Sequence, residues 1–295
     1  MARIGFIGLG NMGGPMSRNL VRAGHTVKGF DLSDEAMRFA IQAGVQRAAT
    51  AADAAREVEV VVTMLPVGSD VRAVLLGSGV VEATAPGTVL IDCSTIDVET
   101  AQAMHRAATE IGRFMLDAPV SGGTKGADAG TLTFMCGGDP AVFERAAPIL
   151  RGMGRNVVLC GGPGMGQVTK ICNNMIAGIT ILAAAEALTL GERLGVDRQT
   201  LYDVISTSTG RSYIFNEACP IPGPVPGAPA SNDYRPGFAA KLMLKDLRLA
   251  QAAAATGGAS TPLGATAAAA YAMHVNNGFG ELDSASIIKL VNPDI

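Results

Sequence analysis

The sequence contains few residues of the kinds that build metal sites and disulfide frameworks. Among its 295 residues are only three histidines and five cysteines, and there is no tryptophan. The histidines His25, His105 and His274 fall in no metal-ligand spacing and in no Ser/His/Asp arrangement, so metal and hydrolase chemistry lack support and we expect no metal. The cysteines form no C-x-x-C pair, which favours buried thiols in a reducing cytosol over disulfides.

Blocks of like charge and a targeting leader are also missing. Charged residues make up 17% of the chain and the net charge is −3, so the sequence indicates neither a nucleic-acid nor a membrane-surface partner. Met1–Arg3 runs directly into an apolar strand-like segment, without the pattern of a secretory signal, and we expect a cytoplasmic protein. The uncharged stretch Ile171–Ala185 is shorter than the roughly 20 apolar residues that span a bilayer, which indicates a buried helix.

The first half of the chain alternates short apolar runs with helical stretches. Hydrophobic residues make up 48% of the sequence, enough for two domains with their own cores. Alternation of this kind predicts a mostly parallel, doubly wound α/β sheet of the Rossmann type. We expect strands at Arg3–Gly8, Val27–Asp31, Val58–Leu65, Val89–Asp92, Phe114–Asp117, Thr133–Cys136 and Val157–Leu159. We expect helices at Met12–Ala23, Asp34–Ala43 and Val98–Ile111, the last with Ser94 or Thr95 at its start.

The pattern changes after a glycine-rich segment at residues 161–164. One long helical pattern follows, about residues 164–194, and no convincing strand comes after it. We therefore expect two domains, an α/β domain at residues 1–163 and an all-helical domain at residues 164–295. The stretch Cys219–Gly237 is dense in proline and glycine and predicts an ordered loop within the helical domain, with a flexible linker as the alternative.

The first strand leads into Gly8-Leu9-Gly10-Asn11-Met12-Gly13 and then a helix, the context of a dinucleotide-binding loop. Gly8 permits the tight turn, Gly10 lets a pyrophosphate approach the backbone, and Gly13 allows close packing of helix and strand. Asp31 ends the next strand, where a carboxylate accepts hydrogen bonds from the ribose hydroxyls and repels a 2′-phosphate. This favours NAD over NADP, although a structural glycine turn and an ordinary strand-end aspartate remain alternatives.

A second glycine motif, Asp117-Ala118-Pro119-Val120-Ser121-Gly122-Gly123, follows another predicted strand. The hydroxyl of Ser121 and the backbone amides of Gly122 and Gly123 form a set of donors suited to a substrate carboxylate. Taken alone, the motif is more typical of an ordinary turn.

Lys170 and Asn174 lie four residues apart on the long helix and so project from one face. Burial lowers the pKa of a lysine from its ordinary value of about 10.4, which would allow Lys170 to exchange a proton with a substrate hydroxyl. Asn174 could orient that oxygen. A solvated lysine is an equally good explanation at this point, and a solvated basic face is the alternative for Lys241 and Lys245.

Four segments in this order resemble the β-hydroxyacid dehydrogenase family over nearly the whole chain. They are residues 5–13, residues 117–123, Gly166–Asn174 and Leu242–Leu247. The resemblance implies NAD-dependent oxidation of 3-hydroxyisobutyrate, or a similar small 3-hydroxy acid, by a homodimer or homotetramer. It also implies a Rossmann domain joined by a long helix to a helical domain, with substrate bound between them.

The resemblance further implies a role for each matching residue. Lys170 matches the family's catalytic lysine and Asn174 a residue that orients the substrate. Residues matching substrate-binding positions are Ser121, Gly122, Gly123, Lys245 and Asp246, and those matching cofactor positions include Leu65, Pro66, Thr95 and Lys245 as well as the glycine-rich loop. Family members that oxidise 3-hydroxyisobutyrate carry tryptophan and then tyrosine where this chain has Tyr213 and Ala218, in the region that covers the substrate, which leaves the preferred acid open.

Other functions remain open on the sequence alone. Within the family these are a tartronate semialdehyde or glyoxylate reductase, an L-serine or 3-hydroxypropionate dehydrogenase and, as a longer chain, a 6-phosphogluconate-type enzyme. A non-catalytic dinucleotide sensor is the alternative from another class, and the presence of Lys170 and Asn174 argues against it.

Overall fold

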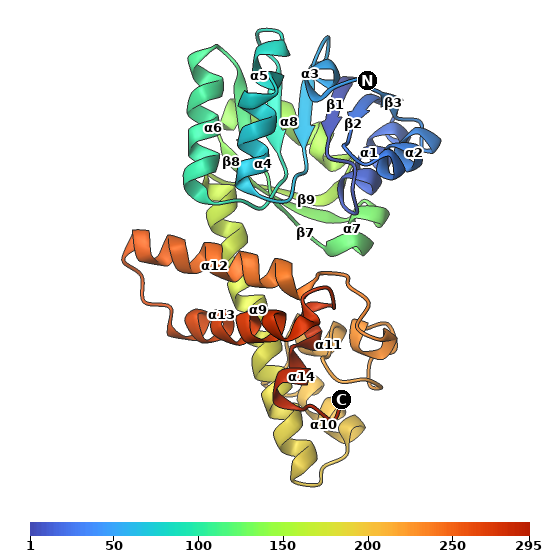
Figure 1. Ribbon diagram of the computed structural model, residues 1–295, viewed down its shortest axis with the longest axis vertical. Helices are drawn as coiled ribbons and strands as arrows, with labels where there is room; N and C mark the ends of the chain where they lie inside the picture. The colour runs from blue at the N-terminus through green and yellow to red at the C-terminus, as the bar shows by residue number, and fades with distance from the viewer. The chain divides into compact units, whose positions relative to one another are not determined.

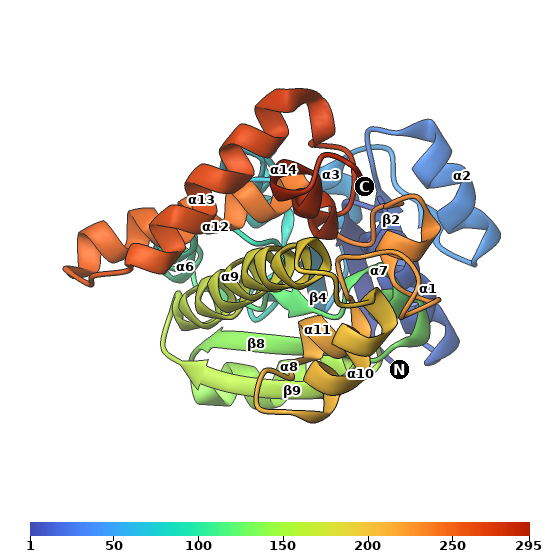
Figure 2. The ribbon, with the colours of Figure 1, turned by 90° about the horizontal axis from the view of Figure 1, so that it is seen from below.

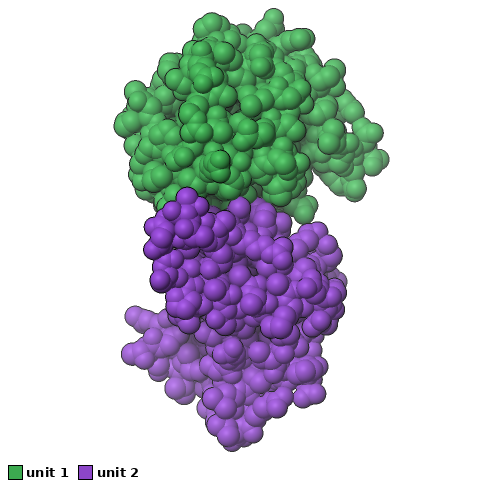
Figure 3. Space-filling model, turned by 60° about the vertical axis from the view of Figure 1, so that its left-hand side comes forward, with its two compact units in different colours: residues 1–170 green, residues 171–295 purple.

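The computed structural model describes all residues from 1 to 295, which divide into two compact units (Figure 3). Unit 1 is Met1–Lys170 and unit 2 is Ile171–Ile295. The division falls inside the long helix α9, Met165–Arg193, seven residues beyond the expected domain boundary at residue 163. Each unit has its own buried apolar cluster, so each is described separately below.

Unit 1 contains one nine-stranded sheet with the strand order β3-β2-β1-β4-β5-β6-β8-β7, to which β9 adds beside β8 (Figure 1). All pairs from β3 to β6 are parallel, while β8 runs antiparallel to β6 and β7. The strands are β1 Arg3–Ile7, β2 Thr26–Phe30, β3 Gln46–Arg47, β4 Val60–Thr63, β5 Val89–Asp92, β6 Phe114–Asp117, β7 Val120–Ser121, β8 Leu132–Gly138 and β9 Gly154–Gly161. The predicted Rossmann-type fold is confirmed, and the two-residue strands β3 and β7 are additions to the expected set.

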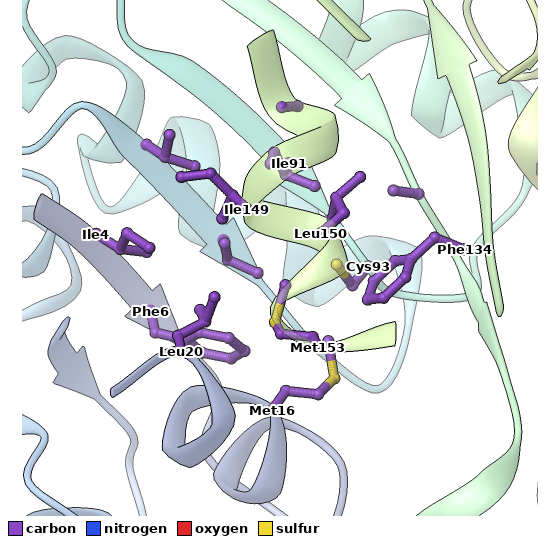
Figure 4. Packing of buried hydrophobic residues seen from close by; sticks show 14 of the residues in the cluster. Ile4, Phe6, Met16, Leu20, Ile91, Cys93, Phe134, Ile149, Leu150 and Met153 are labelled. Carbon is purple, nitrogen blue, oxygen red and sulfur yellow. The ribbon is translucent and has the colours of Figure 1, made fainter. Parts of the chain in front are cut away.

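Helices cover both faces of this sheet because successive strand residues point to opposite sides. Phe6, Ile91 and Phe134 pack with Met16 and Leu20 of α1 on one face (Figure 4). The strand residues that point to the opposite side of the sheet pack there with α3 to α6. The helices of unit 1 are α1 Gly13–Arg22, α2 Asp34–Gln42, α3 Ala51–Ala54, α4 Gly68–Arg72, the π-helical turn η1 Ala73–Gly77, α5 Val80–Ala83, α6 Val98–Glu110, α7 Gly123–Ala129 and α8 Pro140–Arg151.

The start of α6 corrects one sequence expectation. Neither Ser94 nor Thr95 caps this helix, because Asp97 occupies the N-cap position and accepts a hydrogen bond from the backbone N–H of Thr100 (2.7 Å). The hydroxyl of Ser94 is engaged instead with Asp92 at the end of β5 (2.6 Å). Ser94 therefore belongs to the strand end and not to the helix that follows.

Unit 2 is helical, and its core forms around the second part of α9. α12 and α13 form a helical hairpin and lie side by side in both ribbon views (Figures 1 and 2). They pack with Ile181, Ala185 and Leu188 of α9. The helices after α9 are α10 Arg198–Thr207, α11 Tyr213–Glu217, the 3-10 turn η2 Pro229–Asn232, α12 Ala240–Gly257, α13 Pro262–His274, the π-helical turn η3 Val275–Phe279, the 3-10 turn η4 Ser284–Ile287 and α14 Ile288–Val291. The expected long helix and all-helical second half are confirmed.

By length and composition α9 is also the one helix that could cross a membrane. Core helices of water-soluble proteins pass the same test, and about half of its most apolar segment is buried inside the structure. Its residues Ile181, Ala185 and Leu188 belong to the core of unit 2, which assigns α9 as a core helix.

The proline-rich stretch Cys219–Gly237 is an ordered part of unit 2. It contains only the short turn η2, as the prolines require, but Ile221, Ala230 and Tyr234 are buried in the unit 2 core. The hydroxyl of Tyr234 donates to the carbonyl of Pro220 (2.9 Å) and fastens the two ends of the stretch together. An ordered loop is therefore confirmed.

Candidate active site

The glycine-rich loop after β1 and the end of β2 are joined directly by Asp31. The backbone N–H of Leu9 donates to Asp31 Oδ2 (2.6 Å), and the backbone N–H of Ser33 donates to Oδ1 (2.7 Å). These bonds hold the carboxylate beside the loop at the strand ends. In the Rossmann arrangement this position meets the ribose hydroxyls, and a negative charge there disfavours the 2′-phosphate of NADP.

The three glycines of this loop differ in whether the fold requires them. Gly8 has φ +91°, and a Cβ on it would lie 2.2 Å from the carbonyl oxygen of Met64. A Cβ on Gly13 would lie 1.9 Å from the carbonyl oxygen of Gly8. Both glycines are therefore required by the fold. A Cβ on Gly10 would meet nothing within 4 Å, so the missing side chain leaves open space in front of the backbone, which fits a pyrophosphate at the start of α1.

The ends of β4 and β5 carry a buried polar network beneath the expected cofactor positions. The backbone N–H of Leu65 donates to Ser94 Oγ (2.8 Å), and the hydroxyls of Ser94 and Thr63 donate to Asp92 Oδ1 (2.6 and 2.7 Å). Burial raises the pKa of Asp92 to about 6, although the hydrogen bonds from Ser94 and Thr63 act to lower it. The network fixes Leu65 and Ser94, the neighbours of Pro66 and Thr95.

The loop expected to bind a carboxylate contains two positions whose backbone conformation favours glycine. Ser121 ends β7 and is half-buried, and Gly122 and Gly123 follow with φ of +135° and +60°. The positive φ angles explain the glycines by backbone conformation alone. Neither glycine has a side chain of its own to cover its N–H group, which suits a carboxylate site.

Lys170 lies in the second turn of α9 and is buried, with 6% of its surface exposed. Its helix begins in close contact with the sheet of unit 1. The side chain of Gln167 accepts a hydrogen bond from the backbone N–H of Ile96 (3.1 Å) and donates one to the carbonyl of Ser94 (2.8 Å). Asp117 accepts hydrogen bonds from the backbone N–H groups of Gly164 (2.8 Å) and Gln167 (3.0 Å). The first turn of α9 is therefore fastened to the carboxyl ends of β5 and β6.

In unit 2, three expected site residues form one cluster. Asn174 donates a hydrogen bond to Asp246 Oδ2, and Lys245 Nζ lies 3.4 Å from Asp246 Oδ1. Asn174 and Asp246 are buried, with 5% and 1% of their surfaces exposed. The neighbouring Asn173 donates to Asn174 Oδ1 (2.9 Å). Asp246 therefore holds the side-chain amide of Asn174 in one orientation.

Tyr213 stands apart from that cluster, at the start of α11 with 77% of its surface exposed. Three further buried residues of unit 1 have no counterpart among the expected site residues: Asp92, Gln167 and His105. For Asp92 the sequence held a weak signal, because Asp92 and Asp117 both end apolar runs. In the structure these two residues lie opposite each other in the ladder. Gln167 lies in the first turn of the long helix, where side chains commonly satisfy free backbone groups.

The strand order, the open glycine-rich loop and the carboxylate at the end of β2 define the class. Unit 1 is a Rossmann-type domain that binds NAD, and the chain is a two-domain dinucleotide-dependent oxidoreductase.

Comparisons with known proteins agree with this class and narrow it. Residues 3–162 match the family model described as the NAD binding domain of 6-phosphogluconate dehydrogenase. Residues 164–291 match the model described as NAD-binding of NADP-dependent 3-hydroxyisobutyrate dehydrogenase. The second description mentions NADP, whereas a carboxylate just after β2, as Asp31 is here, generally disfavours a 2′-phosphate in Rossmann domains.

The chain is 47% identical to a probable 3-hydroxyisobutyrate dehydrogenase of Mycobacterium tuberculosis, over 98% of this chain and 97% of the relative. It is 44% identical to an NAD-dependent L-serine dehydrogenase of Pseudomonas aeruginosa, over 99% of each. A solved structure of Mycobacterium tuberculosis 3-hydroxyisobutyrate dehydrogenase with L-serine has a TM-score of 0.94 and 46% identity, covering 99% of each chain. The chain belongs to the 3-hydroxyisobutyrate dehydrogenase family.

Proposed function

We propose that this protein oxidises 3-hydroxyisobutyrate, or a 3-hydroxy acid of similar size, with NAD and with Lys170 as the proton acceptor. One observation carries the proposal: a buried lysine follows a helical turn that is fastened to the carboxyl ends of β5 and β6. Because β1, β4, β5 and β6 are parallel, the loop after β1 lies at the same edge of the sheet. Ligands of such sheets bind at this edge.

Each residue of the site has a defined task in the proposed reaction. Ser121 and the amides of Gly122 and Gly123 hold the substrate carboxylate, and Lys170 accepts the proton of the hydroxyl. Bound NAD supplies the hydride acceptor. Leu65, Pro66 and Thr95 line the cofactor site together with the glycine-rich loop. Asn174, Lys245 and Asp246 are proposed substrate residues of unit 2, with Lys245 also serving the cofactor, because they match the family's substrate-binding segments. Tyr213 is proposed as a substrate residue because it falls in the region that covers the substrate, although the family carries tryptophan there.

Lys170 requires burial to serve as a proton acceptor near neutral pH. An ammonium group removed from water loses part of the solvation that stabilises its charge, and its pKa falls. The 6% exposure of Lys170 meets this requirement. If Lys170 is the proton acceptor, oxidation should speed up as the pH rises through the pKa of its amine.

L-serine is the second candidate substrate. It is a small 3-hydroxy acid, and two relatives carry it in their names or titles, at 44% and 46% identity. The two acids differ at carbon 2, where serine carries an ammonium group and 3-hydroxyisobutyrate a methyl group. Selection between them depends on whether the site presents an acceptor or an apolar surface to that position.

We further propose that residues 1–163 form the NAD-binding domain and residues 164–295 the substrate and oligomerisation domain of a cytoplasmic homodimer or homotetramer that acts in valine degradation. Large apolar side chains are exposed on unit 2 and would lose their contact with water in an oligomer. Examples are Ile176, Leu190 and Leu263, with 64%, 61% and 66% of their surfaces exposed.

A steady-state panel tests the proposal. 3-Hydroxyisobutyrate, L-serine, D-glycerate and 3-hydroxypropionate are each measured with NAD and with NADP and ranked by kcat/KM. The proposal expects the highest value for 3-hydroxyisobutyrate with NAD. A higher value for L-serine would support the second candidate, and tight NADH binding without turnover of any acid would contradict catalysis altogether.

A further inference from the structure

Asp117 is a fully buried carboxylate, with 0% of its surface exposed, and the proposed reaction gives it no task. It ends β6 and faces the start of α9. Its Oδ1 accepts the backbone N–H of Gly164 and lies 3.0 Å from His105 Nε2, while its Oδ2 accepts the backbone N–H of Gln167. Gly164 precedes the first helical residue and Gln167 is the third. A single side chain from the sheet thus serves both ends of the first helical turn.

Two glycines show how closely this helix start approaches the sheet. A Cβ on Gly166 would lie 2.3 Å from the carbonyl oxygen of Met135 and 2.7 Å from Asp117 Oδ2. A Cβ on Gly137 would lie 2.6 Å from Asp117 Oδ1 and 2.7 Å from the backbone nitrogen of Gly166. The helix start therefore packs so closely against the sheet that not even a Cβ would fit, which leaves little room for the first turn to slide while the carboxylate keeps its bonds.

We propose that Asp117 is a positioning residue that, together with Gln167, fixes the first turn of α9 and thereby places Lys170 for proton transfer. The inference rests on the proposed function of Lys170. Gln167 and Lys170 are three residues apart, so a shift or rotation of the first turn moves the lysine directly. Misplacing a reacting group by about 1 Å can slow a reaction by ~100-fold.

A negative charge at this place also suits the helix. The first backbone N–H groups of a helix have no partners within it and carry partial positive charge. A carboxylate that accepts two of them satisfies both bonds in a buried site where water cannot. The titratable groups around Asp117 are His105 on α6, Asp92 on β5 and Cys136 on β8.

Asp117→Asn tests the inference because it keeps the size of the side chain but turns one acceptor into a donor that opposes a backbone N–H. We expect kcat to fall by ~10- to 100-fold while the Kd for NADH stays within about twofold of wild type. Gln167→Leu removes the second fastening and should act in the same direction. It also serves if Asp117→Asn folds poorly.

Asp283→Asn is the matched control. Asp283 is another buried carboxylate, 5% exposed, that accepts three backbone N–H groups: that of Ala285 at the start of η4 and those of Gly237 and Phe238 in the segment before α12. It lies in unit 2 and has no proposed part in the reaction. Its replacement should lower the melting temperature without changing kcat measured well below that temperature.

The pH profile of kcat/KM separates positioning from simple stability. A loosened helix start should let the amine of Lys170 reach water, which moves the rising limb of the profile to higher pH in Asp117→Asn. Loss of a negative charge alone would move it to lower pH. A profile and kcat equal to wild type, or a shift to lower pH, would overturn the inference. Should Lys170→Ala retain activity, the proposed function itself fails; an inactive Lys170→Ala beside a fully active Asp117→Asn rejects only the positioning role.

Discussion

Replacing Asp92 by asparagine should reduce the loss of unfolding free energy that the protein shows between acid and alkaline pH. The carboxylate is 1% exposed and its pKa is raised to about 6 by burial. Because this folded-state pKa lies above the ordinary value, the contribution of Asp92 to stability is fully present below pH ~4 and is lost as the pH rises through about 6. Asparagine carries no charge, so the loss should disappear.

The size of the effect follows from the two pKa values. The difference between 3.8 and about 6 corresponds to ~3 kcal/mol of unfolding free energy lost at alkaline pH, at ~1.36 kcal/mol for each unit of pKa. About half of this loss, ~1.5 kcal/mol, falls between pH 5 and pH 8. Asp92 Oδ2 has no hydrogen-bond partner, so an amide group placed there would cost ~1–3 kcal/mol at every pH. The predicted quantity is therefore the change in pH dependence, not the stability at one pH.

Urea unfolding followed by circular dichroism at pH 5 and pH 8 measures this difference, since the chain has no tryptophan to report by fluorescence. Asp34→Asn is the control, because Asp34 is exposed and the pKa of its carboxyl is lowered by its hydrogen bond with Arg47. It should show no relative gain at pH 8. Equal pH dependence in wild type and Asp92→Asn would refute the reasoning.

Three further outcomes are expected. Gly10→Ala should keep the wild-type melting temperature and lose NADH affinity, measured by fluorescence titration. Gly13→Ala should instead lower the melting temperature, since its Cβ would lie 1.9 Å from a backbone oxygen. The same melting temperature and the same NADH affinity in both variants would contradict this. Asp31→Asn should narrow the preference for NAD over NADP by ~10-fold, read from the kcat/KM ratio, and an unchanged ratio would remove Asp31 from cofactor selection. His274 is buried and its pKa is lowered to about 4 by burial, so its contribution to stability is present above pH ~6.5 and lost as the pH falls towards 4; His274→Gln should show a smaller loss of melting temperature on acidification, and an equal loss would contradict this.

Much of unit 1 could be predicted because its signals are local. The strands β5 and β6 begin and end where the apolar runs do, at Val89–Asp92 and Phe114–Asp117. Such buried parallel strands read as continuous apolar segments. The two-residue strands β3 and β7 were missed because they are too short to carry a period, and they form only by pairing with neighbours already in place.

The start of α6 shows why local signals failed elsewhere. Ser94, Thr95 and Asp97 are all acceptable helix caps, so the sequence alone does not identify the cap. In the fold the hydroxyl of Ser94 donates to Asp92. The fastening of α9 was equally hidden. Asp117 and Gln167 are 50 residues apart, and only the fold brings them together.

Proton transfer by Lys170 is tested most directly by its replacement with arginine and with alanine. Arginine keeps the charge but stays protonated, so it cannot accept the hydroxyl proton. Single-turnover oxidation of 3-hydroxyisobutyrate with NAD, followed by NADH absorbance, should slow by ~10²- to 10⁴-fold in both variants, while NADH still binds as in wild type. Turnover at the wild-type rate by Lys170→Arg would contradict the account.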